Sequence, residues 1–124
     1  SETIALLHKM RPMYEVSTFA VEFMSRMLER SSEMAQSVAR IQEGKAFFAE
    51  RMSSLGFKVL PTAGNFLHVA FGARGGAIHA ALAGKVLYRV SCDQPCLAGY
   101  SRFSVAPKSV MSQVADLIQL AVEK

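Results

Sequence analysis

Apolar residues recur at steps of three and four through most of the first half of the chain. In VSTFAVEFMSRMLER, residues 16–30, they lie on one face of an amphipathic helix. The next run keeps this spacing from about Glu33 to Leu55, behind two serines that can cap a helix. Gly56 stands where a helix C-terminus favours a left-handed residue. The first half therefore predicts two long helices, preceded by a shorter one in ETIALLHKM, residues 2–10.

The second half changes to the period of β-strands. Four short apolar or alternating segments predict strands, and GGAIHAALAGK between them predicts a short helix. Pro107 is expected to open a last amphipathic helix, because the first helical position needs no N–H. The four predicted strands are FKVL (57–60), NFLHVAF (65–71), VLYRVS (86–91) and SRFSVA (101–106).

This order of elements predicts the fold class. Three helices, two strands, a helix, two strands and a helix are typical of an α+β two-layer sandwich. We expect a small, mainly antiparallel sheet of about four strands with helices on one side. A length of 124 residues with 51% hydrophobic content suits a single domain, residues 1–124, with a packed core.

Hydropathy and charge indicate where the protein is located and which classes of partner it does not bind. No apolar run reaches the length of a membrane span and no secretory signal is recognisable, so we expect a cytoplasmic protein that does not bind membranes. The net charge of +4 is spread over the chain without a basic block, so nucleic acid is not expected as a partner. A basic RNA-binding sandwich would need aromatic and basic residues together on one sheet face, and these are the only candidates: Tyr88, Arg89, Tyr100, Arg102 and Phe103.

The cysteines and histidines lack the spacing that is typical of a metal site. Cys92 and Cys96 form a C-x3-C pair without the second pair or the histidines that a zinc site requires. His8, His68 and His79 show no ligand spacing with one another or with the cysteines. We expect no metal site, and reduced thiols.

Three segments, in order, resemble the C-terminal small domain of fold-type I, pyridoxal-phosphate-dependent aminotransferases, closest to the histidinol-phosphate aminotransferase branch. The first, RPMYEVSTFAVEF (11–23), is similar to the stretch that leaves the large domain. The second, LGFKVLPTAGNFLHVAF (55–71), is similar to the family pattern lGf-v-ps-aNF-lv-f. The third is similar to the final strand pair and helix, and reads LYRVSCDQPCLAGYSRFSVAPKSVMSQVADLI (87–118).

The resemblance implies that this chain is part of a larger enzyme. A large domain would supply the Schiff-base lysine, the aspartate for the pyridinium nitrogen and the phosphate-binding groups. None of those motifs is readable here: the six lysines lie in amphipathic or turn contexts, and GARGGA (72–77) lacks a GxGxxG pattern. We therefore expect no catalytic or cofactor-binding residue and no activity in the isolated chain. Pyridoxal 5'-phosphate, a homodimer and a small-molecule amino donor and acceptor belong to the intact enzyme. Residues 1–30 would connect this domain to the missing large domain.

Arg102, in YSRFSVA, is the leading candidate for substrate binding. The resemblance implies that this strand arginine holds the α-carboxylate of the substrate. A planar guanidinium can bind a carboxylate through two parallel charge-assisted hydrogen bonds, which also fixes its orientation. The alternative is an arginine that alternates with Phe103 and Val105 and merely faces solvent.

Three further residues are weaker candidates for substrate contact. Asn65 begins a buried strand, where its amide either locks the preceding turn or faces the substrate. Tyr14 lies in the domain-connecting segment and is either a site phenol or a hydrophobic anchor. Arg89 either binds a second acidic group or faces solvent.

The sequence also departs from the family pattern. Ala106 and Pro107 replace the usual Gly and Thr after the arginine strand, and the segment before LYRVS is shortened. The substrate is therefore open between an amino acid and a histidinol-phosphate-like amine. A stand-alone α+β binding or interaction module without enzymatic activity is the alternative, and it explains the missing lysine directly.

Overall fold

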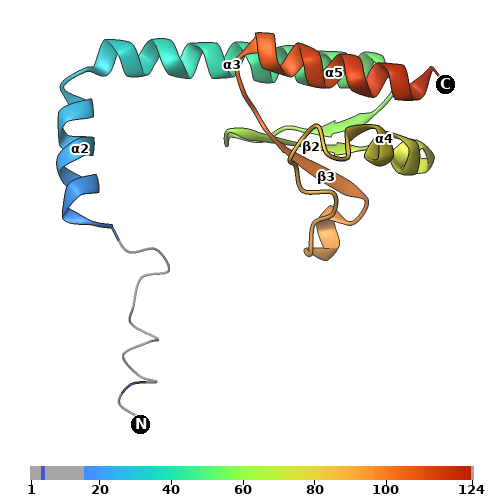
Figure 1. The fold of residues 1–124 in the computed structure, drawn as a ribbon, viewed down its shortest axis with the longest axis horizontal. Coiled ribbons are helices and arrows are strands. Elements are labelled where there is room, and N and C mark those ends of the chain that lie inside the picture. Colours follow the sequence, from blue (N-terminus) through green and yellow to red (C-terminus); the bar gives the residue numbers. More distant parts are fainter. Residues whose placement is uncertain (1–3, 5–15, 124) are drawn as a thin grey trace. The chain divides into compact units, whose positions relative to one another are not determined.

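The computed structural model describes Ile4 and residues 16–123. The chain divides into two compact units, Ser1–Ala35 and Gln36–Lys124, which are described separately below (Figure 1). The helix predicted over residues 2–10 and Tyr14 lie outside the described residues, apart from Ile4. The single domain over residues 1–124 and the connecting role of residues 1–30 stay predictions.

The first unit contains helix α2, Thr18–Leu28. The Ser17 hydroxyl caps it by accepting a hydrogen bond of 3.2 Å from the Ala20 N–H. Arg26 pairs with Glu22 one turn away at 3.1 Å. The amphipathic pattern thus forms the predicted helix, but no residue of α2 is buried, and Phe19 is 79% exposed.

Helix α3 spans Ser31–Ser54, within two residues of the predicted bounds. Its C-terminus closes with Gly56 at φ +83°, while the Phe57 N–H donates to the Met52 carbonyl at 3.0 Å. The Gly56 N–H donates to Ser53 at 2.9 Å, which completes a Schellman motif as Gly56 predicts. No helix in the described part of the chain combines the length and the apolarity that crossing a membrane requires.

The sheet has three antiparallel strands in the order β1-β2-β3: Lys58–Leu60, Phe66–Ala70 and Tyr100–Ser104. Side chains alternate between its two faces. We call the face with the buried side chains of Leu67, Val69, Ser101 and Phe103 the inner face. The opposite face, the outer face, carries Lys58, Leu60, Phe66, His68, Ala70, Tyr100, Arg102 and Ser104.

The segment predicted as a fourth strand, residues 86–91, joins the sheet at one point. Arg89 and Arg102 exchange two backbone hydrogen bonds, of 3.0 and 2.8 Å, and form an isolated bridge. The ladder does not continue, because the carbonyl of Val90 accepts from the Ser101 hydroxyl at 2.7 Å and Leu87 is fully exposed. The α+β class with a mainly antiparallel sheet is confirmed, with three strands and this bridge.

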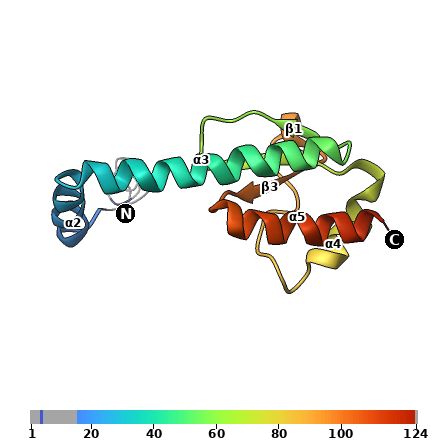
Figure 2. The same ribbon diagram turned by 90° about the horizontal axis from the view of Figure 1, so that it is seen from above.

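Three helices cover the inner face. They are α3, α4 (Gly75–Leu82) and α5 (Lys108–Val122), and each contributes to one core cluster. Figure 2 shows α3 and α5 running in the same direction, and the Arg51 side chain of α3 donates to the Gln119 amide oxygen of α5. The short helices Gly72–Arg74 and Pro95–Leu97 complete the fold.

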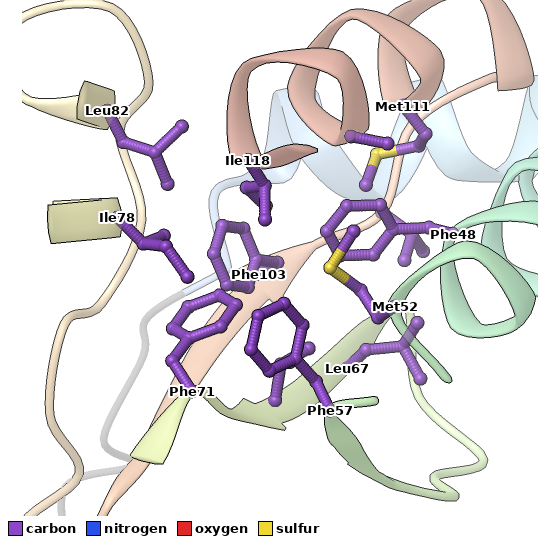
Figure 3. Packing of buried hydrophobic residues seen from close by; sticks show 13 residues of the cluster. Phe48, Met52, Phe57, Leu67, Phe71, Ile78, Leu82, Phe103, Met111 and Ile118 are labelled. Carbon is purple, nitrogen blue, oxygen red and sulfur yellow. The ribbon is translucent and has the colours of Figure 1, made fainter. Parts of the chain in front are cut away.

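Phe103 lies at the centre of this core (Figure 3). Its ring centroid is 5.4 Å from that of Phe48 on α3, 5.9 Å from that of Phe71 and 4.5 Å from that of Tyr88. Such offset and edge contacts add to the free energy gained by burying the rings. Phe103 therefore fixes β3 against the helices, which sets the direction of its neighbour Arg102.

Candidate functional site

A row of polar side chains crosses the outer face of the sheet. His68 on β2 stands directly opposite Arg102 on β3, and Arg102 stands opposite Arg89 in the bridge. Directly opposite residues of antiparallel strands share a face. The structure therefore brings together Arg102 and Arg89, two of the four residues that the sequence singles out, and adds His68 to them.

The guanidinium of Arg102 lies against an aromatic ring. The residue is partly buried, and its guanidinium carbon lies 5.5 Å from the centroid of the Phe66 ring, a cation–π distance. Neither Arg102 nor Arg89 forms an ion pair with any carboxylate of the described residues, whose pairs involve other cations. As far as the described residues go, the nitrogen donors of Arg102 thus remain available for an anion from outside.

The pairing of Arg89 with Arg102 is unfavourable by itself. Like charges directly opposite on neighbouring strands repel each other, and neither charge is offset by a described carboxylate. Repulsion of this kind is relieved when an anion binds between or beside the two groups. The arrangement is therefore suited to a carboxylate or a phosphate.

His68 is buried although it lies on the outer face, with only 8% of its surface exposed. The Phe66 ring meets it edge to face with the centroids 5.3 Å apart. Burial first, and the positive charge of Arg102 second, lower the pKa of His68 below its ordinary value. At neutral pH the imidazole is therefore neutral and adds no third charge to the row.

Asn65 lies on the other side of the sheet. It lines a groove of about 310 Å³ with Ser37 and Ile41 of α3 and with Val105, and its side chain is exposed. Its backbone carbonyl accepts from the Val105 N–H at 2.9 Å, whereas no side-chain hydrogen bond of Asn65 is found among the described residues. The structure therefore does not bring Asn65 together with Arg102 on one face.

The turn before β2 is locked by residues that the sequence did not single out. The Thr62 hydroxyl donates to the Phe66 carbonyl at 2.9 Å and accepts from the Gly64 N–H at 3.2 Å. Lys45 of α3 donates to the carbonyls of Thr62 and of Gly64, the latter at 2.7 Å. These contacts perform the turn-locking role that was one alternative for Asn65.

The aromatic residues of the RNA-binding alternative are divided between the two faces. Tyr88 stacks on Phe103 over the inner face and shares a 2.6 Å hydrogen bond with His79 Nδ1. Burial raises the pKa of Tyr88, which keeps its hydroxyl neutral. Only Tyr100 remains with the two arginines on the outer face, so the five residues do not form one stacking platform.

The described lysines do not fit pyridoxal phosphate. Lys45 is engaged by two backbone carbonyls, whereas Lys58, Lys85 and Lys108 are exposed. Lys45 is the one lysine of the described residues that is partly buried, and it lines a cavity of about 420 Å³, but its amine is held by those carbonyls. The glycine-rich turn leads into a helix of only eight residues. Cys92 and Cys96 are free thiols, and no group of His, Cys, Asp or Glu in the described residues could hold a metal ion.

The sequence missed Phe66 and His68 as parts of this site. A usable signal was present, since both lie at even spacing from each other on one strand and so share a face. Their position beside Arg102, however, depends on the register between β2 and β3, which are separated by about 30 residues of chain.

Comparison with known proteins identifies one family model and several proteins that are similar to this chain. A family model described as "Aminotransferase class I and II" matches residues 1–119. The histidinol-phosphate aminotransferase of Citrifermentans bemidjiense is 30% identical over 120 residues, which are 95% of this chain and 34% of that protein. The protein of the same name from Geobacter sp. (strain M21) is 29% identical over 120 residues, with the same coverage.

A third relative, the histidinol-phosphate aminotransferase of Geotalea daltonii, is 29% identical over 122 residues, which are 96% of this chain and 35% of that protein. The chain thus spans about a third of the length of the curated relatives that it matches. The family match covers almost all of the chain and includes both arginines of the outer face. The chain belongs to the class I and II aminotransferase family.

Proposed function

We propose that this chain is the substrate-recognising small domain of a pyridoxal-phosphate-dependent aminotransferase, in which Arg102 binds the α-carboxylate of the substrate. The observation that carries the proposal is the bridge between Arg89 and Arg102. In this bridge the two arginines are directly opposite each other on the outer face, and neither has a carboxylate partner among the described residues. A protein site with this charge and exposure favours an anionic ligand.

The chemistry of each arginine follows from its surroundings. Arg102 is partly buried and lies against Phe66, so few rotamers remain to be lost when it binds a carboxylate. Its fork of donors fixes the orientation of the carboxylate, which a lysine would not do. Arg89 is exposed and adjacent, which suits a second acidic group on the same ligand.

The substrate class is an amino acid or a histidinol-phosphate-like amine. The names of the relatives support the second, and a phosphate is bound by the same guanidinium geometry as a carboxylate. Asn65 and Tyr14 are further proposed contacts from the side of the domain junction. Asn65 would then act from the groove beside α3 and not from the outer face.

The remaining parts of the enzyme lie outside this chain. Bound pyridoxal phosphate supplies an electron sink for the transamination chemistry. Since the described lysines do not fit it, we assign the cofactor to a large domain and propose that the chain alone does not transaminate. The homodimer and the cytoplasmic location are proposed for that intact enzyme.

Anion binding by the 124-residue chain tests the proposal. The side-chain resonances of the arginines are followed by NMR while L-glutamate is added, with methylamine as the control that has an amine but no carboxylate. We expect saturable binding of glutamate and none of methylamine. Arg102→Gln should weaken binding about tenfold, or ~1.4 kcal/mol, a reduced value because the site is partly exposed.

Two substitutions sharpen this test. Arg102→Lys keeps the charge but not the fork, so it should bind glutamate between the wild type and Arg102→Gln. Arg89→Gln should weaken binding by a smaller factor, about threefold, because Arg89 is more exposed. Binding that is unchanged in Arg102→Gln contradicts the carboxylate assignment and favours the stand-alone module.

A further inference from the structure

Three residues of the outer face form a contact chain: Phe66, His68 and Arg102. The Phe66 ring lies 5.5 Å from the Arg102 guanidinium carbon and 5.3 Å from the His68 ring centroid. His68 is also directly opposite Arg102 in the ladder. Each member thus contacts or faces the other two, and α3, α4 and α5 pack on the opposite face.

The burial of His68 comes from these neighbours. On β1 the directly opposite residue is Leu60, and on β3 it is Arg102. The titratable and charged groups near it on the outer face are Arg102, Arg89 one position further on, and Lys58 and Tyr100 at diagonal positions. Among the described residues, no carboxylate pairs with Arg102, Arg89 or Lys58, because the ion pairs found there involve other cations.

We infer that His68, together with Phe66, is a positioning residue for Arg102: their rings hold the guanidinium on the outer face, and a proton gained by His68 strengthens the binding of an anion there. The inference rests on the proposed function, since it takes Arg102 to be the anion-binding group. It goes beyond it by giving the site a neighbour with its own protonation equilibrium.

The coupling follows from charge. With Arg102 unpaired, its positive charge and the burial of His68 both disfavour the imidazolium. An anion on Arg102 cancels part of that charge, so the pKa of His68 rises when the anion binds. By linkage, the anion then binds more tightly as the pH falls through the range in which His68 gains its proton.

The test uses methanesulfonate, an anion that does not titrate between about pH 5.5 and about pH 7.5, the range in which a histidine changes charge. Its dissociation constant is measured by NMR at both values for the wild-type chain and for His68→Gln. We expect about threefold tighter binding at the lower pH for the wild type, which corresponds to a rise of about half a pKa unit in His68. For His68→Gln, the dissociation constants at the two pH values should be equal.

Two control variants separate the roles. His79→Gln removes a histidine that is bonded to Tyr88 over the inner face, and it should keep the threefold ratio. Phe66→Leu keeps an apolar cover but removes the aromatic face. It should weaken binding about two- to fivefold at both pH values, since an exposed cation–π contact contributes about 0.5–1 kcal/mol, and it should leave the ratio unchanged.

A direct titration of His68 in the wild type covers the case in which His68→Gln does not fold. Its ring resonances should show a higher apparent pKa with saturating methanesulfonate than with methylammonium chloride as the matched salt. An identical pKa under the two conditions overturns the inference.

The variant Arg102→Gln distinguishes the two proposals. If it abolishes binding while His68→Gln retains the ratio, the arginine assignment stands and only the inference about His68 fails. If Arg102→Gln binds methanesulfonate like the wild type, the proposed function fails, and the inference fails with it.

Discussion

Phe103 and Arg102 are neighbours on strand β3, yet their side chains lie on opposite faces of the sheet and make different contacts. Phe103 points to the inner face, is 2% exposed and contacts rings from α3, from the end of β2 and from the bridge segment. Arg102 points to the outer face, with one aromatic contact and no described ion-pair partner. The inner face therefore holds the fold together, and the outer face carries the residues that we propose for binding. Substitutions on the two faces should differ accordingly.

The largest expected effect is on the inner face. Phe103→Ala removes a fully packed ring and should lower the free energy of unfolding by about 3–5 kcal/mol. Phe66→Ala, the matched change on the outer face, removes a ring that is only partly buried and should cost less than about 1.5 kcal/mol. Urea unfolding measures both. Equal losses would mean that the outer face is also a structural surface.

A second pair of changes tests how closely α3 packs against the segment that leads into α5. At Gly44 of α3, an added Cβ would overlap the carbonyl oxygen of Ala106 and come within 2.9 Å of the Lys108 nitrogen. Gly44→Ala should therefore destabilise the protein by about 1–3 kcal/mol, against the usual gain for alanine in a helix.

Gly76 in α4 is the control for that change, because nothing lies within 4 Å of its added Cβ. Gly76→Ala should raise the free energy of unfolding by up to about 1 kcal/mol. If Gly44→Ala is also stabilising, the segment that enters α5 is not fixed against α3.

The sequence was sufficient for elements whose pattern is local. Helices α3 and α5 follow from apolar spacing, and their ends follow from Gly56 and Pro107, although Pro107 precedes the first helical residue and does not occupy it. The fourth strand depended on pairing and not on propensity: VLYRVS has strand-forming residues, but its backbone forms a bridge with the backbone of β3 only at Arg89. Pairing between distant segments is not encoded in the pattern of either one.

The candidate site could be predicted only in part, because some of its contacts also depend on pairing between distant segments. Arg102 and Arg89 were identified through the family resemblance, and their adjacency follows from a bridge that the resemblance did not specify. Asn65 was expected either to lock the preceding turn or to face the substrate; in the structure it lines the groove beside α3, while Thr62 and Lys45 lock the turn. His68 was treated as an ordinary histidine because its opposition to Arg102 exists only in the folded register.

A smaller effect should appear in the pH dependence of stability. Since the pKa of His68 is lowered on folding, the unfolded chain binds more protons just below pH 6.5 than the folded chain does. The stability contributed by neutral His68 is therefore complete above that pH and is lost as the pH falls towards the folded pKa. The urea midpoint should fall between about pH 7.5 and about pH 5.5.

His68→Gln should reduce this fall in the urea midpoint, because a glutamine side chain does not take up a proton in that range. His79→Gln controls for the loss of a histidine in general and should retain the fall that His68 causes. A wild-type midpoint that is constant over the range would mean that His68 is as exposed to water in the folded chain as in the unfolded one.

The smallest effect distinguishes binding from stability most clearly. Arg89 is exposed, opposes another arginine and has no ion-pair partner among the described residues, so Arg89→Gln removes repulsion without breaking a described ion pair. The free energy of unfolding should rise by a few tenths of a kcal/mol, about 0.2–0.5, at low salt. The gain should shrink at high salt, because counterions screen exposed charges.

The same variant should weaken anion binding, so stability and affinity should change in opposite directions. A loss of more than about 1 kcal/mol in stability would instead assign Arg89 a structural role, since surface changes without such a role stay within about 0.5 kcal/mol, and the bridge could no longer be interpreted as a charge pair kept for a ligand.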